Sequence, residues 1–435
     1  EPGTTEKIKM EKLYSFFLEH PHIQTDTRAL KRDEIFFALK GPNFNGNTYA
    51  KKALEDGAAG AVVDEPIGTE GDHIFLVEDV LTTLQQLALH HRKQFKIPFI
   101  AITGSNGKTT TKELIHAVLS STYKTYTTKG NLNNHIGIPL TILSIQKDAE
   151  IAIIEMGANH QKEIEAYCTY VLPTHGIINN CGKAHLEGFG GIEGVRKGKG
   201  ELFDFLANDN GIAFINSDLD YLINMSKRIQ HKVYYGNQLG AFQTIIFQND
   251  PLLVLEVDHS TLHQQKIFTN LVGAYNKPNV EAAICVGEYF KIPFDTIRNA
   301  IESYVPSNAR SQLIEKGSNT IILDAYNANP NSMQAALENF SLQQITKKIV
   351  LLGAMMELGE DAIKEHQHII EQIKQMHFSQ VILVGGDFEH TVHPYRFFKH
   401  VDDACIWLKN HMPSNSTILI KGSRSMKMEK LLEVL

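Results

Sequence analysis

The chain alternates short apolar runs with longer stretches in which apolar residues recur at helical spacing. In the first part, residues 34–39 and 58–63 are apolar runs that predict strands. Helices are expected at 10–20, from its periodicity, and at 49–56, which a glycine follows. Residues 1–97 are therefore predicted to form a small α/β domain.

The middle of the chain, residues 98–305, opens with an apolar run at 99–103. Further strands are predicted at 123–126, 151–157, 176–179 and 211–216, a strand-rich stretch at 231–272, and helices at 279–289 and 294–304.

Residues 306–435 return to a regular alternation of strand and helix. Strands are predicted at 320–324, 348–353, 381–385 and 416–421, and helices at 332–340, 362–376, 401–410 and 426–435. This order is typical of a doubly wound, Rossmann-like domain. No G-x-G-x-x-G follows its first strand, so dinucleotide binding is not expected there.

The composition limits the classes of protein to which the chain can belong. The 435 residues are 43% apolar and 21% charged, which is ordinary for a globular protein of several domains. A net charge of −7 argues against a general binder of nucleic acid or membrane surfaces. Four widely spaced cysteines suit a reducing compartment, and no signal peptide or membrane span is recognisable, so a cytoplasmic location is expected.

A Gly-rich turn after the apolar run at 99–103 leads into the helix-compatible stretch 111–119. The turn reads Gly104-Ser105-Asn106-Gly107-Lys108-Thr109-Thr110. Its backbone N–H groups and the helix dipole can bind a phosphate, Lys108 would reach the β/γ-phosphates, and the Thr109 hydroxyl would bind Mg²⁺. The usual first glycine of this motif is Ile102 here, so a chance Gly-Lys-Thr turn is the alternative. The strand before it and the helix after it favour a phosphate site.

Two other polar clusters admit two interpretations each. Glu155 ends an apolar run, where a carboxylate can bind magnesium or merely cap the next helix. Residues 25–28 supply several donors and one acid, which the sequence alone favours as a polar turn. The His-containing loop 179–190 and the basic, Gly-rich stretch 196–203 are weak signals separately: one histidine is more often structural, and such a basic run is usually a solvated loop.

Taken together, these segments resemble the Mur ligase family, the ATP-dependent amide ligases of peptidoglycan precursor synthesis. The matching segments span the chain and are 25–28, 37–41, 103–110, 130–134, 154–160, 184–190, 324–330 and 421–425. The resemblance implies an α/β fold of three domains: a UDP-substrate domain (1–97), a central P-loop-type ATPase domain (98–305) and a C-terminal Rossmann-like domain (306–435).

The resemblance also implies a reaction and its participants. The enzyme would add D-alanyl-D-alanine to UDP-N-acetylmuramoyl-tripeptide through an acyl phosphate, using ATP and two Mg²⁺ ions, and would act as a monomer. Thr109 and Glu155 would bind one ion, and His185 and a carbamylated Lys199 the other. Arg310 would reach the phosphates from the C-terminal domain and act with Lys108, His185 and Lys199 in catalysis.

Binding roles follow in the same way. The implied nucleotide residues are Gly104, Ser105, Asn106, Gly107, Lys108, Thr109, Thr110, Asn276, Asn279, Arg310, Asp324 and Asn327. The implied residues for the UDP-linked substrate are Thr25, Asp26, Thr27, Arg28, Lys40, Gly41, Asn131, Asn133 and Asn134.

Some positions depart from the family pattern. Tyr275 stands in place of a usual histidine, Ala354 in place of a common aspartate, and Arg310 lacks the Pro-Gly that usually precedes it. These changes affect local nucleotide contacts rather than the reaction class.

Other functions were weighed against this one. A different Mur step is disfavoured by the 184–190 and 324–330 segments, and a folylpolyglutamate synthase by the 25–28 and 37–41 segments. A nucleotide-dependent switch is suggested only by Asn276-Lys277-Pro278-Asn279, which lacks the final aspartate that reads guanine.

Overall fold

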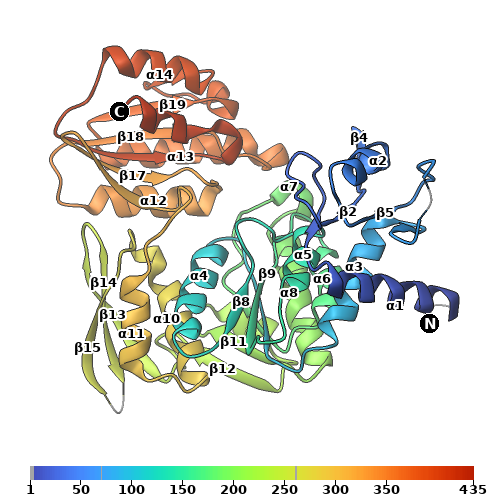
Figure 1. The fold of residues 1–435 in the computed structure, drawn as a ribbon. Helices are drawn as coiled ribbons and strands as arrows, with labels where there is room; N and C mark the ends of the chain where they lie inside the picture. The colour runs from blue at the N-terminus through green and yellow to red at the C-terminus, as the bar shows by residue number, and fades with distance from the viewer. Residues whose placement is uncertain (1–3, 70, 260–261) are drawn as a thin grey trace. The chain divides into compact units, whose positions relative to one another are not determined.

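The computed structural model describes residues 4–69, 71–259 and 262–435 (Figure 1). Its internal contacts divide the chain into two compact units. The first comprises the residues up to 101 with 124–157 and 165–174, and the second comprises 102–123, 158–164 and 175–435.

The first unit begins with a four-stranded parallel sheet in the order β1-β2-β5-β6. Strands β2 and β5 are buried at every position, which explains their continuous apolar sequences. Helix α2 packs Ala50 and Ala53 into the same core. The elements are α1 (Thr4–Glu19), β1 (Ile23–Gln24), β2 (Ile35–Phe37), β3 (Lys40–Gly41), β4 (Phe44–Asn45), α2 (Asn47–Glu55), β5 (Gly60–Val63), β6 (Ile74–Leu76) and α3 (Val80–Arg92).

A six-stranded sheet has the order β12-β11-β10-β7-β9-β8. Its pairs β8–β9, β10–β11 and β11–β12 are parallel, and parallel strands gather their carboxyl ends at one edge, where ligands bind in such sheets. Its strands are β7 (Phe99–Thr103), β8 (Thr125–Thr127), β9 (Ile151–Glu155), β10 (His175–Ile178), β11 (Ile212–Asn216) and β12 (His231–Tyr235). The helices between them are α4 (Lys108–Ser120), α5 (Gly137–Leu143), α6 (Glu163–Val171), α7 (Leu186–Phe189), α8 (Ile192–Asn208) and α9 (Asp220–Met225).

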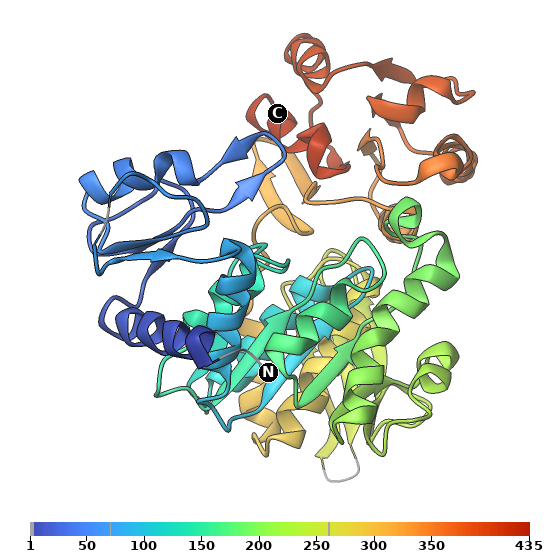
Figure 2. The same cartoon turned by 90° about the vertical axis from the view of Figure 1, so that its right-hand side faces the viewer.

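Helix α8 lies along β10 and β11 in the second unit (Figure 2). The close approach requires Gly176 in β10, because a Cβ there would come within 2.7 Å of Leu206 Cδ1. This contact fixes which side of α8 is buried, and Lys199 belongs to the buried side.

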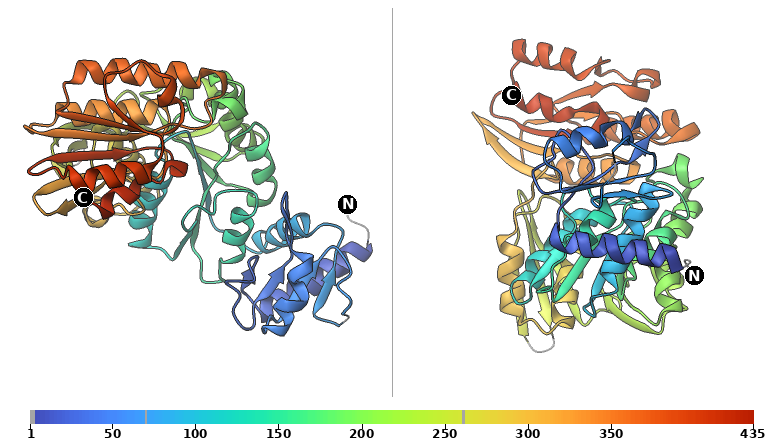
Figure 3. Two further views of the ribbon diagram at one scale, coloured as in Figure 1. Left: turned by 90° about the horizontal axis from the view of Figure 1, so that it is seen from above. Right: turned by 45° about the vertical axis from the view of Figure 1, so that its right-hand side comes forward.

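An antiparallel sheet of three strands follows in the second unit (Figure 3). It consists of β13 (Phe242–Asn249), β14 (Leu253–His259) and β15 (Leu262–Phe268). Next come η1 (Ala274–Asn276), α10 (Lys277–Tyr289), which packs along α4, and α11 (Phe294–Ser303), which contacts β15. The strand-rich prediction for 231–272 is confirmed, although its residues 260–261 lie outside the described ones.

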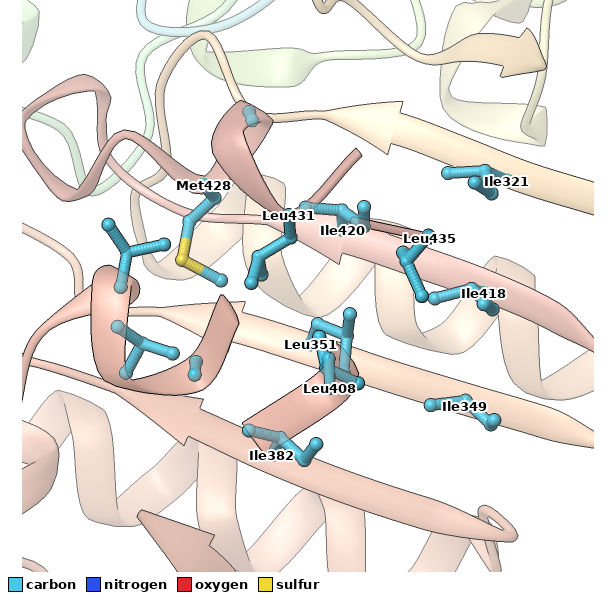
Figure 4. Packing of buried hydrophobic residues seen from close by; sticks show 14 of the residues in the cluster. Ile321, Ile349, Leu351, Ile382, Leu408, Ile418, Ile420, Met428, Leu431 and Leu435 are labelled. Atoms are coloured by element: carbon cyan, nitrogen blue, oxygen red, sulfur yellow. The ribbon is translucent and has the colours of Figure 1, made fainter. Parts of the chain in front are cut away.

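The last sheet has the order β16-β17-β21-β18-β19-β20, parallel except for the β16–β17 pair. Alternate strand residues, such as Leu351 and Ile420, pack against α14 and the C-terminal turn η5 (Figure 4), while α12 and α13 pack on each other (Figure 1). The elements are β16 (Gln312–Lys316), β17 (Asn319–Asp324), α12 (Pro330–Leu342), β18 (Lys348–Gly353), η2 (Gly359–Asp361), α13 (Ala362–Met376), β19 (Gln380–Val384), η3 (Gly386–His390), β20 (Arg396–Phe398), α14 (Val401–Asn410), β21 (Thr417–Lys421), η4 (Arg424–Met426) and η5 (Met428–Glu433).

The predicted α/β fold is confirmed, with several local corrections. The elements that were not predicted include helices α3, α5, α6 and α9 and the sheet-edge strands β6, β16 and β20. The helix predicted at 426–435 is two 3₁₀ turns, separated by Lys427 in a left-handed conformation. The basic stretch 196–203, whose local interpretation was a solvated loop, lies inside α8. Across the described residues, every helix is too short or too polar to cross a membrane.

Candidate active site

The Gly-rich turn lies between β7 and α4, as predicted. Gly107 caps α4 with a φ of 82°, and Gly104 has a φ of 147°. The backbone N–H of Ser105 donates to Asn180 O at 3.0 Å, and that of Asn106 to Asn180 Oδ1 at 2.9 Å. Lys108 Nζ folds back onto Gly104 O at 2.7 Å, so the ammonium is held over the turn at the N-terminus of α4.

Buried polar side chains, joined to one another by hydrogen bonds, lie against this turn. Asn179 Nδ2 donates to Thr111 Oγ1 at 2.6 Å, and Thr111 Oγ1 donates to Asn279 Oδ1 at 3.0 Å. Asn279 Nδ2 in turn donates to Asn276 Oδ1 at 2.9 Å. A Cβ at Gly107 would lie 2.7 Å from Asn279 Oδ1, so the turn touches these side chains directly.

These contacts show how Asn276 and Asn279 are connected to the phosphate turn. The resemblance places both near the nucleotide, and both are buried and joined to the phosphate turn through Thr111. The sequence analysis did not single out Thr111 or Asn179. Only their positions, just after the turn and at the end of a strand, could have indicated them.

Lys199 is 1% exposed in α8. Its Nζ donates to Ala158 O at 3.1 Å and lies 5.1 Å from the centre of the Phe189 ring. Burial, and secondarily the charge of Lys108, lower the pKa of Lys199 to about 7. Its amine therefore has a substantial neutral, nucleophilic fraction at neutral pH.

His185 precedes α7, and its Nδ1 bonds to Glu357 Oε2 from the loop before η2. The hydrogen bond from His185 is the main cause that lowers the pKa of the Glu357 carboxyl. The sequence analysis gave Glu357 no role. Nothing in the sequence indicates the pairing, since the two residues are 172 positions apart.

Residues beyond 306 reach the phosphate turn within the second unit. Asn329 Nδ2 donates to Asn106 Oδ1 at 2.7 Å, and Lys183 Nζ pairs with Glu365 Oε1 at 2.7 Å. Asn329 also caps α12, with Pro330 in its first turn. The Asn-Pro signal predicts a helix start but not the contact with Asn106.

The other C-terminal candidates engage one another. The Arg310 guanidinium carbon lies 3.6 Å from the centre of the Tyr326 ring. Lys421 Nζ pairs with Asp324 Oδ2 at 2.7 Å and donates to Asn327 O at 3.4 Å. Asp324 and Asn327 are thus brought together by a buried lysine that the sequence analysis left unassigned.

In the first unit, Glu155 ends β9 and is 1% exposed. Its Oε1 accepts from Asn133 Nδ2 at 2.8 Å, so a predicted substrate residue contacts the predicted metal ligand. Asn134 Oδ1 accepts from the backbone N–H groups of Ile136 and Gly137, and Asn131 O accepts from Asn133 N.

The predicted UDP residues also lie in the first unit. Asp26 and Arg28 form a bidentate pair with each other, with Arg28 mostly exposed. Lys40 Nζ pairs with Asp64 Oδ1 at 2.9 Å and Glu65 Oε1 at 2.8 Å. Gly41 is required because a Cβ there would lie 2.2 Å from Phe44 Cε1. Thr25 and Thr27 belong to the same turn as Asp26.

Among the described residues, no three His, Cys, Asp or Glu side chains are gathered into a metal cage. Mg²⁺ does not need one, because it commonly takes one or two protein oxygens together with phosphate oxygens and water. A buried carboxylate at a strand end, such as Glu155, suits that kind of site.

Two family models match this chain. Residues 102–287 match the family model of the Mur ligase middle domain, and 309–424 match that of the Mur ligase glutamate ligase domain. The UDP-N-acetylmuramoyl-tripeptide–D-alanyl-D-alanine ligase of Bacillus subtilis is 33% identical over 94% of this chain and 92% of its own length. The Escherichia coli protein of the same name is 31% identical over 95% and 93%.

Solved structures extend the comparison to the fold. MurF from Acinetobacter baumannii superposes with a TM-score of 0.85 at 28% identity, covering 95% of this chain and 92% of its own. MurF ligase from Thermotoga maritima, solved in complex with ADP, gives a TM-score of 0.86 at 26% identity over 96% and 97%.

Proposed function

The chain belongs to the Mur ligase family, and we propose that it uses ATP to join D-alanyl-D-alanine to UDP-N-acetylmuramoyl-tripeptide. The match along nearly the whole chain carries this proposal. It includes the phosphate turn of the second unit and the later residues that contact that turn.

The phosphate turn and α4 would bind the nucleotide. The N-terminus of α4 favours an anion, and Lys108 supplies a full positive charge. The amide chain Asn179–Thr111–Asn279 holds the turn in place, which lets it meet the phosphates without reorganising. Arg310 supplies a further cation from the C-terminal part.

Two Mg²⁺ ions would complete the site. Thr109 and Glu155 would hold one ion, and His185 with Lys199 the other, provided that Lys199 is carbamylated. Such ions neutralise phosphate charge as the phosphoryl group moves. Lys199 is suited to the modification, because its neutral amine can add CO₂ and become an anion with two oxygens.

The reaction needs activation of a carboxylate. ATP would first phosphorylate the terminal carboxylate of the tripeptide, and the amine of D-alanyl-D-alanine would then attack the acyl carbon and release phosphate. Lys108 and Arg310 would stabilise the charge on the transferred group, while the buried surroundings of Lys199 would keep water from the acyl phosphate.

We also propose that different parts of the chain have different roles in binding and catalysis. Residues 1–97 would bind the UDP end through Thr25–Arg28, Lys40 and Gly41, residues 98–305 would bind ATP, and residues 306–435 would complete the ligase site. The family models, which match 102–287 and 309–424, support the last two parts. A cytoplasmic location would supply ATP and suits four cysteines that are all free.

The test is product formation from defined substrates. With UDP-N-acetylmuramoyl-tripeptide and D-alanyl-D-alanine, we expect ADP release matched by a UDP-pentapeptide in the mass spectrum. L-alanyl-L-alanine is the matched control and should give neither. Ligation of a single amino acid to a shorter UDP-peptide, or of glutamate to a folate, would assign the chain to another branch of the family.

A further inference from the structure

The loop after β10 and the loop after β18 meet at His185 and Glu357. His185 Nδ1 bonds to Glu357 Oε2, and the backbone N–H of Glu187 donates to Glu357 O at 3.4 Å. A Cβ at Gly359 would lie 3.3 Å from Glu187 Cβ, so the two loops pass close to each other. The contact therefore involves backbone and side chains of both loops, rather than one surface ion pair.

Both partners have an unusual backbone conformation. His185 has a φ of 53° and Glu357 a φ of 59°, in the left-handed region that non-glycine residues rarely adopt. Such a conformation is unfavourable for a non-glycine residue and persists only where its surroundings require it. The two loops are thus held in the shape that brings this carboxylate to this ring.

The hydrogen bond to Glu357 determines which nitrogen of the His185 ring carries a hydrogen. A carboxylate accepts, so Nδ1 carries a hydrogen, and a neutral ring bonded in this way has its lone pair on Nε2. Histidines that bind metals usually have this arrangement, in which a carboxylate on one nitrogen orients the other toward the ion. Within the described part of the chain, the ring's hydrogen bond runs through Nδ1 and leaves Nε2 available.

We infer that Glu357 is a positioning residue for His185, through which the C-terminal α/β part sets the affinity of the His185 cation site. The inference rests on the proposed role of His185 as a metal ligand. Glu357 lies in the stretch matched by the C-terminal family model, whereas His185 lies in the stretch matched by the middle-domain model.

A consequence follows from linkage. If docking of the 354–361 loop strengthens cation binding at His185, cation binding must strengthen docking of that loop by the same factor. The metal and the C-terminal part would then assemble the site together, in one coupled equilibrium.

The test measures Mn²⁺ binding, because Mn²⁺ replaces Mg²⁺ and is detected by electron paramagnetic resonance. The full chain is titrated with Mn²⁺ in the presence of a non-hydrolysable ATP analogue and bicarbonate. Glu357→Gly removes the carboxylate and suits the left-handed backbone, Glu357→Gln keeps an acceptor oxygen, and His185→Ala removes the ligand. Glu360→Ala is the matched control, because Glu360 is an exposed acid three positions away.

We expect the weaker Mn²⁺ site of the wild type to be lost in His185→Ala and weakened about 10- to 100-fold in Glu357→Gly. Glu357→Gln should weaken it less, and Glu360→Ala should leave it unchanged. The electron spin-echo signal of a ¹⁴N nucleus bound to Mn²⁺ should vanish in His185→Ala and persist in Glu357→Gln. Amide exchange at 354–361 should slow on adding Mn²⁺ in the wild type but not in Glu357→Gly.

Three results would overturn the inference. Unchanged Mn²⁺ affinity in Glu357→Gly, with the site lost in His185→Ala, would leave Glu357 without a positioning role. Complete loss in Glu357→Gln would make Glu357 a ligand itself. Unchanged binding in His185→Ala would remove the premise, and substrate-dependent ADP release by the wild type would show separately whether the proposed ligase function survives.

Discussion

At the scale of single residues, burial decides what an ordinary side chain can do. Lys197 is exposed, whereas its neighbour Lys199 lies on the buried side of α8. Its pKa of about 7 follows from that orientation rather than from the local sequence. The same amine on the outer side of α8 would be an ordinary ammonium ion.

Replacement of Lys199 tests its proposed carbamylation. Lys199→Ala should lose most ligation activity, because the anion that would face the second Mg²⁺ is missing. Acetate or propionate should restore part of the activity, whereas bicarbonate should not. Lys197→Ala, an exposed position of the same helix, is the control and should be near wild type. Near-normal ADP release by Lys199→Ala would exclude the role.

His175 predicts how stability depends on pH. It is buried between aromatic rings, with Nε2 3.1 Å from Tyr289 Oη, and burial lowers its pKa to about 4. Below pH 6.5 His175 binds a proton in the unfolded chain, whereas in the folded chain it binds that proton only near pH 4. Folding free energy should therefore be lost as the pH falls through this window, by at most about 3 kcal/mol.

The measurement is chemical unfolding of wild type and His175→Gln at several pH values between 7 and 4. The variant should be less stable at pH 7 but should show a shallower decline. His368→Gln, at an exposed position, should keep the wild-type slope. Equal slopes in wild type and His175→Gln would show that other groups cause the decline.

At the scale of elements, the phosphate turn is supported by side chains from outside the turn itself. Thr111 comes from the second turn of α4, Asn179 follows β10, and Asn279 lies in the first turn of α10. Packing of α10 along α4 brings the three together. The turn is therefore shaped by three elements as well as by its own glycines.

Gly107→Ala tests this support. An alanine there has to adopt a φ of 82° and would place its Cβ 2.7 Å from Asn279 Oδ1. We expect a rise in the Kd for ATP of at least tenfold, corresponding to about 1.4 kcal/mol, measured by calorimetry. Gly317→Ala is the control, because Gly317 also has a positive φ but no heavy atom within 4 Å of the added Cβ. Equal ATP affinity in both variants would contradict the collision argument.

At the scale of the whole molecule, the proposed site draws on residues far apart in sequence. The phosphate turn lies near residue 105, whereas the candidate cation Arg310 comes from the C-terminal part and lies over the Tyr326 ring. A site divided in this way should be complete only when its substrates are bound.

ATP hydrolysis should accordingly be slow for the enzyme alone. We expect phosphate release to stay weak with either UDP-N-acetylmuramoyl-tripeptide or D-alanyl-D-alanine, and to rise at least tenfold when both are present. Lys108→Ala gives the background of the assay. Fast turnover of ATP without the two substrates would contradict a divided site.

The sequence by itself determined the features that depend on near neighbours along the chain. The buried strands β7 and β9, the bounds of α13 and α14, and the phosphate turn between β7 and α4 all follow from local apolar runs, periodicity and glycines. The motifs also placed Lys108, Glu155, His185 and Lys199 as candidates. Where local signals were weak, as at the edge strands β16 and β20 and the turns after 423, the prediction was incomplete or wrong.

Only the tertiary structure decided which candidates meet and in what chemical state. Desolvation of Lys199 depends on how α8 packs on β10, and the orientation of His185 depends on a carboxylate 172 positions away. The Asn179–Thr111–Asn279 chain joins a strand end and two helices. Electrostatic environment and hydrogen-bond partners are properties of neighbours in space, and a single sequence records only neighbours along the chain.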